Sequence, residues 1–135
     1  MATIERFEDL QSWQKARQLA NTVYELTNRT GFAKDFQLRD QIRDAAGSVM
    51  HNIAEGFDSG TDPEFIRFLK IARRSASEVQ SELYLALDRR YIRADELKIA
   101  YDLATEAKRL INGMIAYLRK QAGNRPIKKS HSQPQ

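Results

Sequence analysis

The positions of proline limit the fold of this chain more than any other feature. The three prolines are Pro63, Pro126 and Pro134, and none of them interrupts a segment with periodic apolar residues. Proline inside a helix removes a backbone hydrogen bond and clashes with the preceding turn, so it is expected only near helix ends. The segments between the breaks have apolar residues at three- and four-residue spacing, and no strand-like alternation competes with this pattern. The sequence therefore predicts an all-α fold.

Four long helices fit between the expected breaks. Gly31 and Gly56 mark the first two turns, while Asp62 can cap the third helix and Pro63 suits its first turn. Long helices joined by short connections favour an antiparallel up-down four-helix bundle. The expected helices span residues 8–28, 36–55, 62–90 and 94–121.

Length and composition predict one bundle domain with a short tail. The chain has 135 residues, enough for a single domain, and no cysteine, which excludes disulfides, thiolate metal sites and cysteine nucleophiles. No secretory signal precedes the bundle and no apolar run approaches the roughly 20 residues of a membrane span, so we expect a cytoplasmic protein. We assign residues 1–123 to the bundle and residues 124–135 to a disordered basic tail.

Most of the positive charge lies in that tail. Arg125, Lys128 and Lys129 are accompanied by no acidic residue, which leaves 19 basic against 18 acidic residues in positions 1–123. Because the body is nearly neutral, any polyanion-binding surface there requires basic residues gathered on one face.

The third and fourth helices carry more apolar surface than one bundle buries. A helix in an isolated bundle needs one apolar stripe and an opposite polar face. Both helices have apolar residues beyond that stripe, which predicts that copies of the chain cover one another. The expected interface residues are Ile66, Ile71, Tyr84, Leu85, Ile99, Leu103, Leu110 and Tyr117.

The chain contains several motifs that can be compared with known families. The most specific are Asn52-Ile53-Ala54-Glu55-Gly56 and the run from Glu64 to Arg73, followed by Glu78. Shorter motifs are Phe7-Glu8-Asp9-Leu10, Trp13-Gln14-Lys15-Ala16 and Tyr24-Glu25-Leu26-Thr27. Together these motifs resemble the bacterial S23 family of four-helix-bundle proteins, also called 23S rRNA intervening-sequence proteins.

The resemblance covers roughly residues 7–120 and implies a homopentamer without an established enzymatic activity. A more distant relative, the accessory protein of diversity-generating retroelements, implies binding to RNA or DNA. The chain departs from the family pattern at Gln37, where glycine is common, and at Asp44, where a basic residue is common. Arg74 replaces a frequent glycine, which strengthens a basic patch on the third helix.

Basic residues on the third helix form the candidate nucleic-acid-binding site. Arg67, Lys70 and Arg74 project away from the core stripe and Arg73 lies at its edge. Cations in this arrangement neutralise backbone phosphates and release counterions. The tail residues Arg125, Lys128 and Lys129 add nonspecific affinity in this interpretation. In the alternative interpretation, the helix cations pair with Glu78 and Glu82 at helical spacing, and the face is solvated.

No catalytic, metal or cofactor site is expected. Neither His51 nor His131 follows a glutamate by three residues, which excludes the di-iron bundle motif. Arg125 and His131 match the spacing of HEPN ribonucleases, but they lie in the tail with Pro126 between them. We expect structural roles for the motif residues Asn52, Glu55 and Gly56, with Asn52 bonding to a neighbouring helix and Glu55 reaching an arginine across a protomer interface. The predicted function is a non-enzymatic, self-associating scaffold that binds RNA or DNA, with a purely protein-binding accessory module as the alternative.

Overall fold

The computed structural model describes residues 4–124, and the side-chain surroundings up to Gln121. The described part is helical and contains no strand, which confirms the predicted all-α class. Residues 125–135 of the predicted tail lie outside the described residues. The elements in chain order are η1 (Phe7–Asp9), α1 (Gln11–Thr27), α2 (Thr30–Lys34), α3 (Phe36–Phe57), α4 (Asp62–Asp88) and α5 (Ala94–Asn124).

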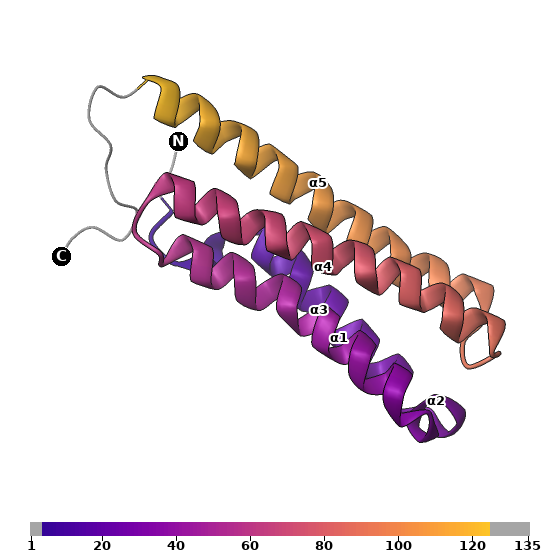
Figure 1. The fold of residues 1–135 in the computed structure, drawn as a ribbon. Coiled ribbons are helices and arrows are strands. Elements are labelled where there is room, and N and C mark those ends of the chain that lie inside the picture. The colour runs from indigo at the N-terminus through magenta and orange to yellow at the C-terminus, as the bar shows by residue number, and fades with distance from the viewer. Residues whose placement is uncertain (1–3, 125–135) are drawn as a thin grey trace.

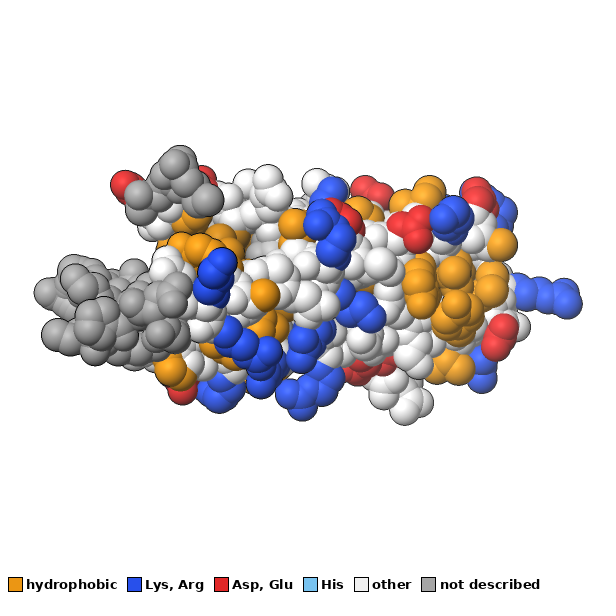
Figure 2. Space-filling view, turned by 90° about the horizontal axis from the view of Figure 1, so that it is seen from above, with side chains coloured by type: hydrophobic (Ala, Val, Ile, Leu, Met, Phe, Trp, Pro, Cys, Tyr) orange, Lys and Arg blue, Asp and Glu red, His pale blue; other side chains and the backbone are white. Residues whose placement is uncertain are grey.

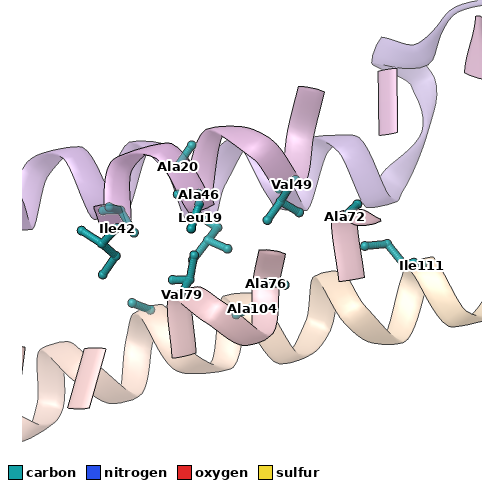
Figure 3. Packing of buried hydrophobic residues seen from close by; sticks show 14 of the residues in the cluster. Leu19, Ala20, Ile42, Ala46, Val49, Ala72, Ala76, Val79, Ala104 and Ile111 are labelled. Atoms are coloured by element: carbon teal, nitrogen blue, oxygen red, sulfur yellow. The ribbon is translucent and has the colours of Figure 1, made fainter. Parts of the chain in front are cut away.

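The four long helices lie side by side, and the short α2 covers one end (Figure 1). Helix α1 packs against α3 and α5, and α4 packs against the same two helices. Each long helix therefore has two neighbours around a shared core. Figure 3 shows part of this core, in which Leu19, Ile42, Val49, Val79 and Ile111 are fully buried.

Small residues bring the helices close together. Ala46, Ala72, Ala76 and Ala104 are fully buried in the core (Figure 3). Alanine at a helix contact leaves little side-chain bulk between the two backbones, so the interaxial distance is short. The apolar stripes predicted from the sequence therefore include the residues that set the helix spacing.

Gly56 has a different role from the helix stop that the sequence suggested. Helix α3 continues to Phe57, so Gly56 is a buried residue within its last turn. A β-carbon at this position would lie 2.8 Å from Cβ of Phe68 and 2.9 Å from Cδ1 of Phe65. The glycine is needed because α4 approaches the end of α3 too closely for a side chain.

Several predicted helix boundaries are also corrected. Leu10 separates η1 from α1, and Gly31 lies inside α2 rather than in a turn. The side chain of Thr61, not that of Asp62, caps α4 by accepting a hydrogen bond from the Glu64 amide at 3.3 Å. Propensity patterns locate such ends only to within a few residues.

Helix α4 ends two residues earlier than predicted, in a left-handed turn. Arg90 has a φ of 63°, and its amide donates to the carbonyl of Leu87 at 2.9 Å. The amide of Tyr91 donates to the carbonyl of Ala86, also at 2.9 Å. This pair of bonds is a Schellman motif, which usually has glycine at the left-handed position.

Side chains from two turns join at the end of the bundle covered by α2. Tyr91, in the α4–α5 turn, stacks on the fully buried Phe32 with ring centroids 5.2 Å apart. The Tyr91 hydroxyl donates to Oδ2 of Asp35 at 2.9 Å, and Arg29 forms an ion pair with Glu96. We call these five residues the end clasp.

Candidate nucleic-acid interface

Basic side chains gather in an open groove between α4 and α5. The groove has a volume of about 480 Å³ and is lined by Lys70, Arg73, Arg74, Ser77, Lys108 and Asn112. Four of these six residues are basic and none is acidic. Figure 2 views the molecule from above Figure 1 and shows Lys and Arg side chains clustered over the middle of this face. We call this feature the α4–α5 groove.

Arg73 is held in the groove by an uncharged partner. Its Nη1 donates a hydrogen bond to Oδ1 of Asn112 at 2.7 Å, which links α4 to α5. An amide oxygen orients the guanidinium without cancelling its charge, and the remaining N–H groups can still donate to an anion. Arg73 is therefore positioned as well as positive.

Lys108 reaches the groove from α5 and is positioned in the same way. Its Nζ donates to Oε1 of Gln80 at 2.8 Å and to Oγ of Ser77 at 3.1 Å. The buried Gln80 is fixed in turn, because its Nε2 donates to Oγ1 of Thr105 at 2.9 Å and to the carbonyl of Tyr101 at 3.2 Å. A neutral polar network thus holds this cation.

Lys70 and Arg74 are exposed at the outer edge of the groove. Within residues 4–124, neither side chain forms an ion pair with an acidic residue. Both charges are therefore open to a ligand. The predicted pairing of Arg74 with a glutamate of its own helix does not occur in the structure.

Arg67 differs from the other predicted site residues. It is not among the groove-lining residues, and its Nη2 lies 3.0 Å from Oε1 of Glu64. Its guanidinium also lies over the Phe68 ring, 4.5 Å from the centroid. The hydrogen bond and charge of Glu64 raise the pKa of Arg67 above its ordinary value. The structure brings Lys70, Arg73 and Arg74 together but leaves Arg67 in a local pair.

Sequence reasoning missed Lys108, Asn112 and Ser77. Lys108 and Asn112 are four residues apart and share one face of α5, which is a recognisable spacing. Their relation to α4 depends on the register of the two helices, and the helical period alone does not supply it. The predicted tail residues Arg125, Lys128 and Lys129, and His131, lie outside the described residues.

The opposite side of α4 is acidic where it meets α3. Glu82 is 7% exposed, and burial together with the nearby Glu78 and Asp44 raises its pKa to about 7. The prediction that Glu78 and Glu82 pair with the helix cations is therefore wrong for Glu82, which interacts with other acids. The two sides of α4 carry opposite charge.

Asn52 belongs to a polar contact between α3 and α4. Its Nδ2 donates to the carbonyl and to Oγ of Ser48, at 2.8 and 2.9 Å, within its own helix. Ser48 Oγ then lies 2.8 Å from Oγ of Ser75 in α4. The predicted bond to a neighbouring helix is thus made through Ser48 rather than by Asn52 itself. Glu55 is exposed, and its predicted partner across a protomer interface stays a prediction.

The predicted interface residues fall into two groups. Ile66 and Leu103 are partly buried and pack against the core, and Ile71 and Leu110 are half-buried. The other four are 43–59% exposed, namely Tyr84, Leu85, Ile99 and Tyr117. In Figure 2, apolar side chains gather beside the basic cluster, toward the end away from the grey residues.

Residues 4–124 contain neither a metal-binding cluster nor a membrane-spanning helix. Between residues 4 and 124, no group of three or more histidine, aspartate or glutamate side chains could hold a metal ion. Across the same part of the chain, no helix is both long and apolar enough to cross a membrane.

The fold places the chain among small all-helical bundle proteins. A sequence model described as 23S rRNA-intervening sequence protein matches residues 8–113, and the chain belongs to that family. A similar solved structure is a protein of unknown function from the S23 ribosomal protein family of Bacteroides thetaiotaomicron VPI-5482. It has a TM-score of 0.71 and 24% sequence identity, over 78% of this chain and 95% of that chain, which supports the fold. No curated protein matches the chain.

Proposed function

We propose that this protein is a non-enzymatic, cytoplasmic scaffold that binds RNA or DNA through a basic surface centred on the α4–α5 groove. The observation that carries the proposal is the set of four cations lining one groove without an acidic residue. Each cation that neutralises a phosphate releases condensed counterions, so a few such contacts give salt-dependent affinity. The family to which the chain belongs is described as 23S rRNA-intervening sequence protein, and this description is consistent with a nucleic-acid ligand.

The scaffold is proposed to be a homo-oligomer of up-down four-helix protomers, with five copies as the family resemblance implies. Its support in this chain is the exposure of Tyr84, Leu85, Ile99 and Tyr117. Symmetric assembly would repeat the groove around one particle and multiply weak contacts. Light scattering is expected to give a mass near five times 15.6 kDa, and a 15.6 kDa particle at high concentration would contradict this part of the proposal.

Nucleic-acid binding is tested by fluorescence anisotropy of the purified protein at two salt concentrations. The variant carries Arg67, Lys70 and Arg74 changed to Ala. We expect its affinity to fall and its log-log salt dependence to become shallower by about 0.9 for each lost phosphate contact. Since Arg67 is paired with Glu64, most of the loss should come from Lys70 and Arg74.

A matched control changes Arg93, Lys98 and Arg109 to Ala. These three residues carry the same total charge as the groove set, but each pairs with an acidic residue of α5 and none lines the groove. The control should bind almost as tightly as the natural chain. Absence of binding at low salt, or equal loss in both triple variants, would exclude the groove as the binding surface.

The alternative function is a protein-binding accessory module without nucleic-acid affinity. The exposed apolar side chains and the acidic side of α4 favour this alternative if no nucleic acid binds. A ribonuclease that uses Arg125 and His131 predicts RNA cleavage that His131→Ala abolishes. We expect no cleavage by either the natural chain or that variant.

A further inference from the structure

We propose that the α4–α5 groove grips the sugar-phosphate backbone of a nucleic-acid duplex, with Arg73 and Lys108 as fixed phosphate ligands. This inference rests on the proposed function and specifies which form of nucleic acid the groove accepts. It also assigns a binding role to Lys108 and a positioning role to Asn112.

Hydrogen bonds hold the two inner cations of the groove, Arg73 and Lys108, in place. Arg73 is bonded to Asn112 at 2.7 Å, and Lys108 is bonded to Gln80 and Ser77 at 2.8 and 3.1 Å. Each partner is neutral and lies on a packed helix, so these two cations lose less side-chain freedom on binding than unbonded surface cations would. Fixed cations suit a ligand whose phosphates are themselves held at fixed positions.

The two outer cations of the groove follow the axis of α4. Lys70 and Arg74 are four residues apart on α4, which places them about 6 Å apart along the helix axis. Both are exposed beside the fixed pair. A DNA duplex has a persistence length of about 150 base pairs, so its phosphates already lie at nearly fixed spacings. The duplex therefore loses little conformational freedom when these phosphates contact a rigid row of charges.

The lining of the groove offers no surface on which bases could stack. Proteins that bind single strands combine basic residues with aromatic side chains on which the bases stack. The six groove-lining residues include no aromatic residue. Contacts between cations and phosphates position the backbone and carry no direct sequence information. Binding in the groove should therefore be independent of the base sequence.

The test compares RNA duplex, DNA duplex and single strands of equal length by fluorescence anisotropy of the full chain. Arg125, Lys128 and Lys129 are changed to Ala in all proteins, which removes the charge of the tail. We expect either duplex to bind at least about tenfold more tightly than its single strand at about 50 mM salt, with a steep loss by about 200 mM. The duplex that binds more tightly shows whether the groove prefers RNA or DNA.

Two groove variants separate charge from positioning. Lys108→Ala should make the log-log salt dependence shallower by about 0.9 per contact. Asn112→Ala removes no charge, so it should keep the salt dependence but weaken duplex binding by roughly threefold to tenfold, because Arg73 is no longer held. Lys98→Ala and Asn21→Ala are the respective controls, since both are exposed residues outside the groove.

The outcomes distinguish this inference from the proposed function. If single strands bind as tightly as duplexes and Lys70, Arg74 and Lys108 are still required, the duplex assignment is wrong and the proposed function stands. If Asn112→Ala binds like the natural chain, Arg73 is not a fixed ligand. If no nucleic acid binds at low salt, both proposals fail.

Discussion

Helix α4 meets its two neighbours in opposite ways. Against α3, contacts are close: Gly56 leaves no room for a side chain, and Ser48 and Ser75 share a hydrogen bond. Against α5, long side chains leave an open groove lined by cations. The comparison shows that one helix can provide stability on one side and a ligand surface on the other.

The two sides of α4 also differ in the groups that surround their ionisable side chains. On the α3 side, Glu82 is buried near Glu78 and Asp44, and its pKa is raised to about 7. On the α5 side, Arg73 and Lys108 form hydrogen bonds to neutral partners. Substitutions on the α3 side should therefore alter folding, while those on the α5 side should alter binding.

The largest expected effect comes from filling the closest contact between α3 and α4. Gly56→Ala should lower the free energy of unfolding by about 1–3 kcal/mol, because the new methyl group overlaps Phe65 and Phe68. Urea denaturation measures the change. Gly113→Ala is the control, since a β-carbon there meets nothing within 4 Å and alanine favours a helix. If Gly56→Ala had the same free energy of unfolding as the natural chain, α3 and α4 could move apart without a loss of stability.

The second largest effect is a pH dependence of stability that arises from the buried carboxyl group of Glu82. In the folded state, Glu82 has a pKa of about 7 rather than 4.5, so the folded chain binds this proton more tightly than the unfolded chain. Its contribution to stability is fully present below the unfolded pKa and is lost as pH rises through about 7.

Glu82→Gln should remove this loss. At about pH 8, the variant is expected to be about 1–2 kcal/mol more stable than the natural chain, and the difference should shrink toward zero near pH 4. Thermal denaturation across this pH range measures it. The exposed Glu25→Gln should leave the profile unchanged, and a pH-independent gain in Glu82→Gln would contradict the assignment.

A smaller effect is expected at the hydroxyl pair between α3 and α4. Ser48→Ala should cost about 1 kcal/mol, because it leaves the buried Ser75 hydroxyl without its partner across the contact. Changing both serines to Ala should cost less than the two single changes together. A double-mutant cycle measures this coupling, and additive costs would mean that the hydroxyls do not act as a pair.

The smallest change in stability is expected in the groove. Arg73→Ala should alter the free energy of unfolding by no more than about 0.5 kcal/mol, because Arg73 pairs with no acid and its partner Asn112 is exposed. The same denaturation experiment applies. A loss comparable to that of Gly56→Ala would mean that the groove residues mainly hold α4 and α5 together.

Sequence patterns predicted most of the fold because the helical period repeats over long segments. The all-α class and the segments forming α1, α3, α4 and α5 were correct, with differences confined to their ends. Helix α2 was missed because its five residues are too few to show a period. The role of Gly56 was misassigned because glycine marks both helix ends and close contacts, and only the position of α4 distinguishes them.

The candidate site was only half predictable for a related reason. The helical period places Lys70, Arg73 and Arg74 on one side of α4, and the structure brings them together. Lys108 and Asn112 join them through the register between α4 and α5, which depends on packing along the whole contact. The partners of Arg67 and Glu82 also depend on rotamers and neighbouring helices, which the spacing of charges does not fix.

The end clasp has a consequence for how the chain could be divided. Residues 29–35 follow α1 and residues 91–96 follow α4, yet Tyr91 joins Phe32 and Asp35, and Arg29 joins Glu96. The two halves of the molecule, α1 to α3 and α4 to α5, are thus fastened by side chains at the end opposite their peptide connection. A cut between Asp58 and Thr61 would give one fragment with α1 to α3 and another with α4 and α5. Because the end clasp provides specific contacts between these fragments, the protein is suited to reassembly from two separately expressed fragments.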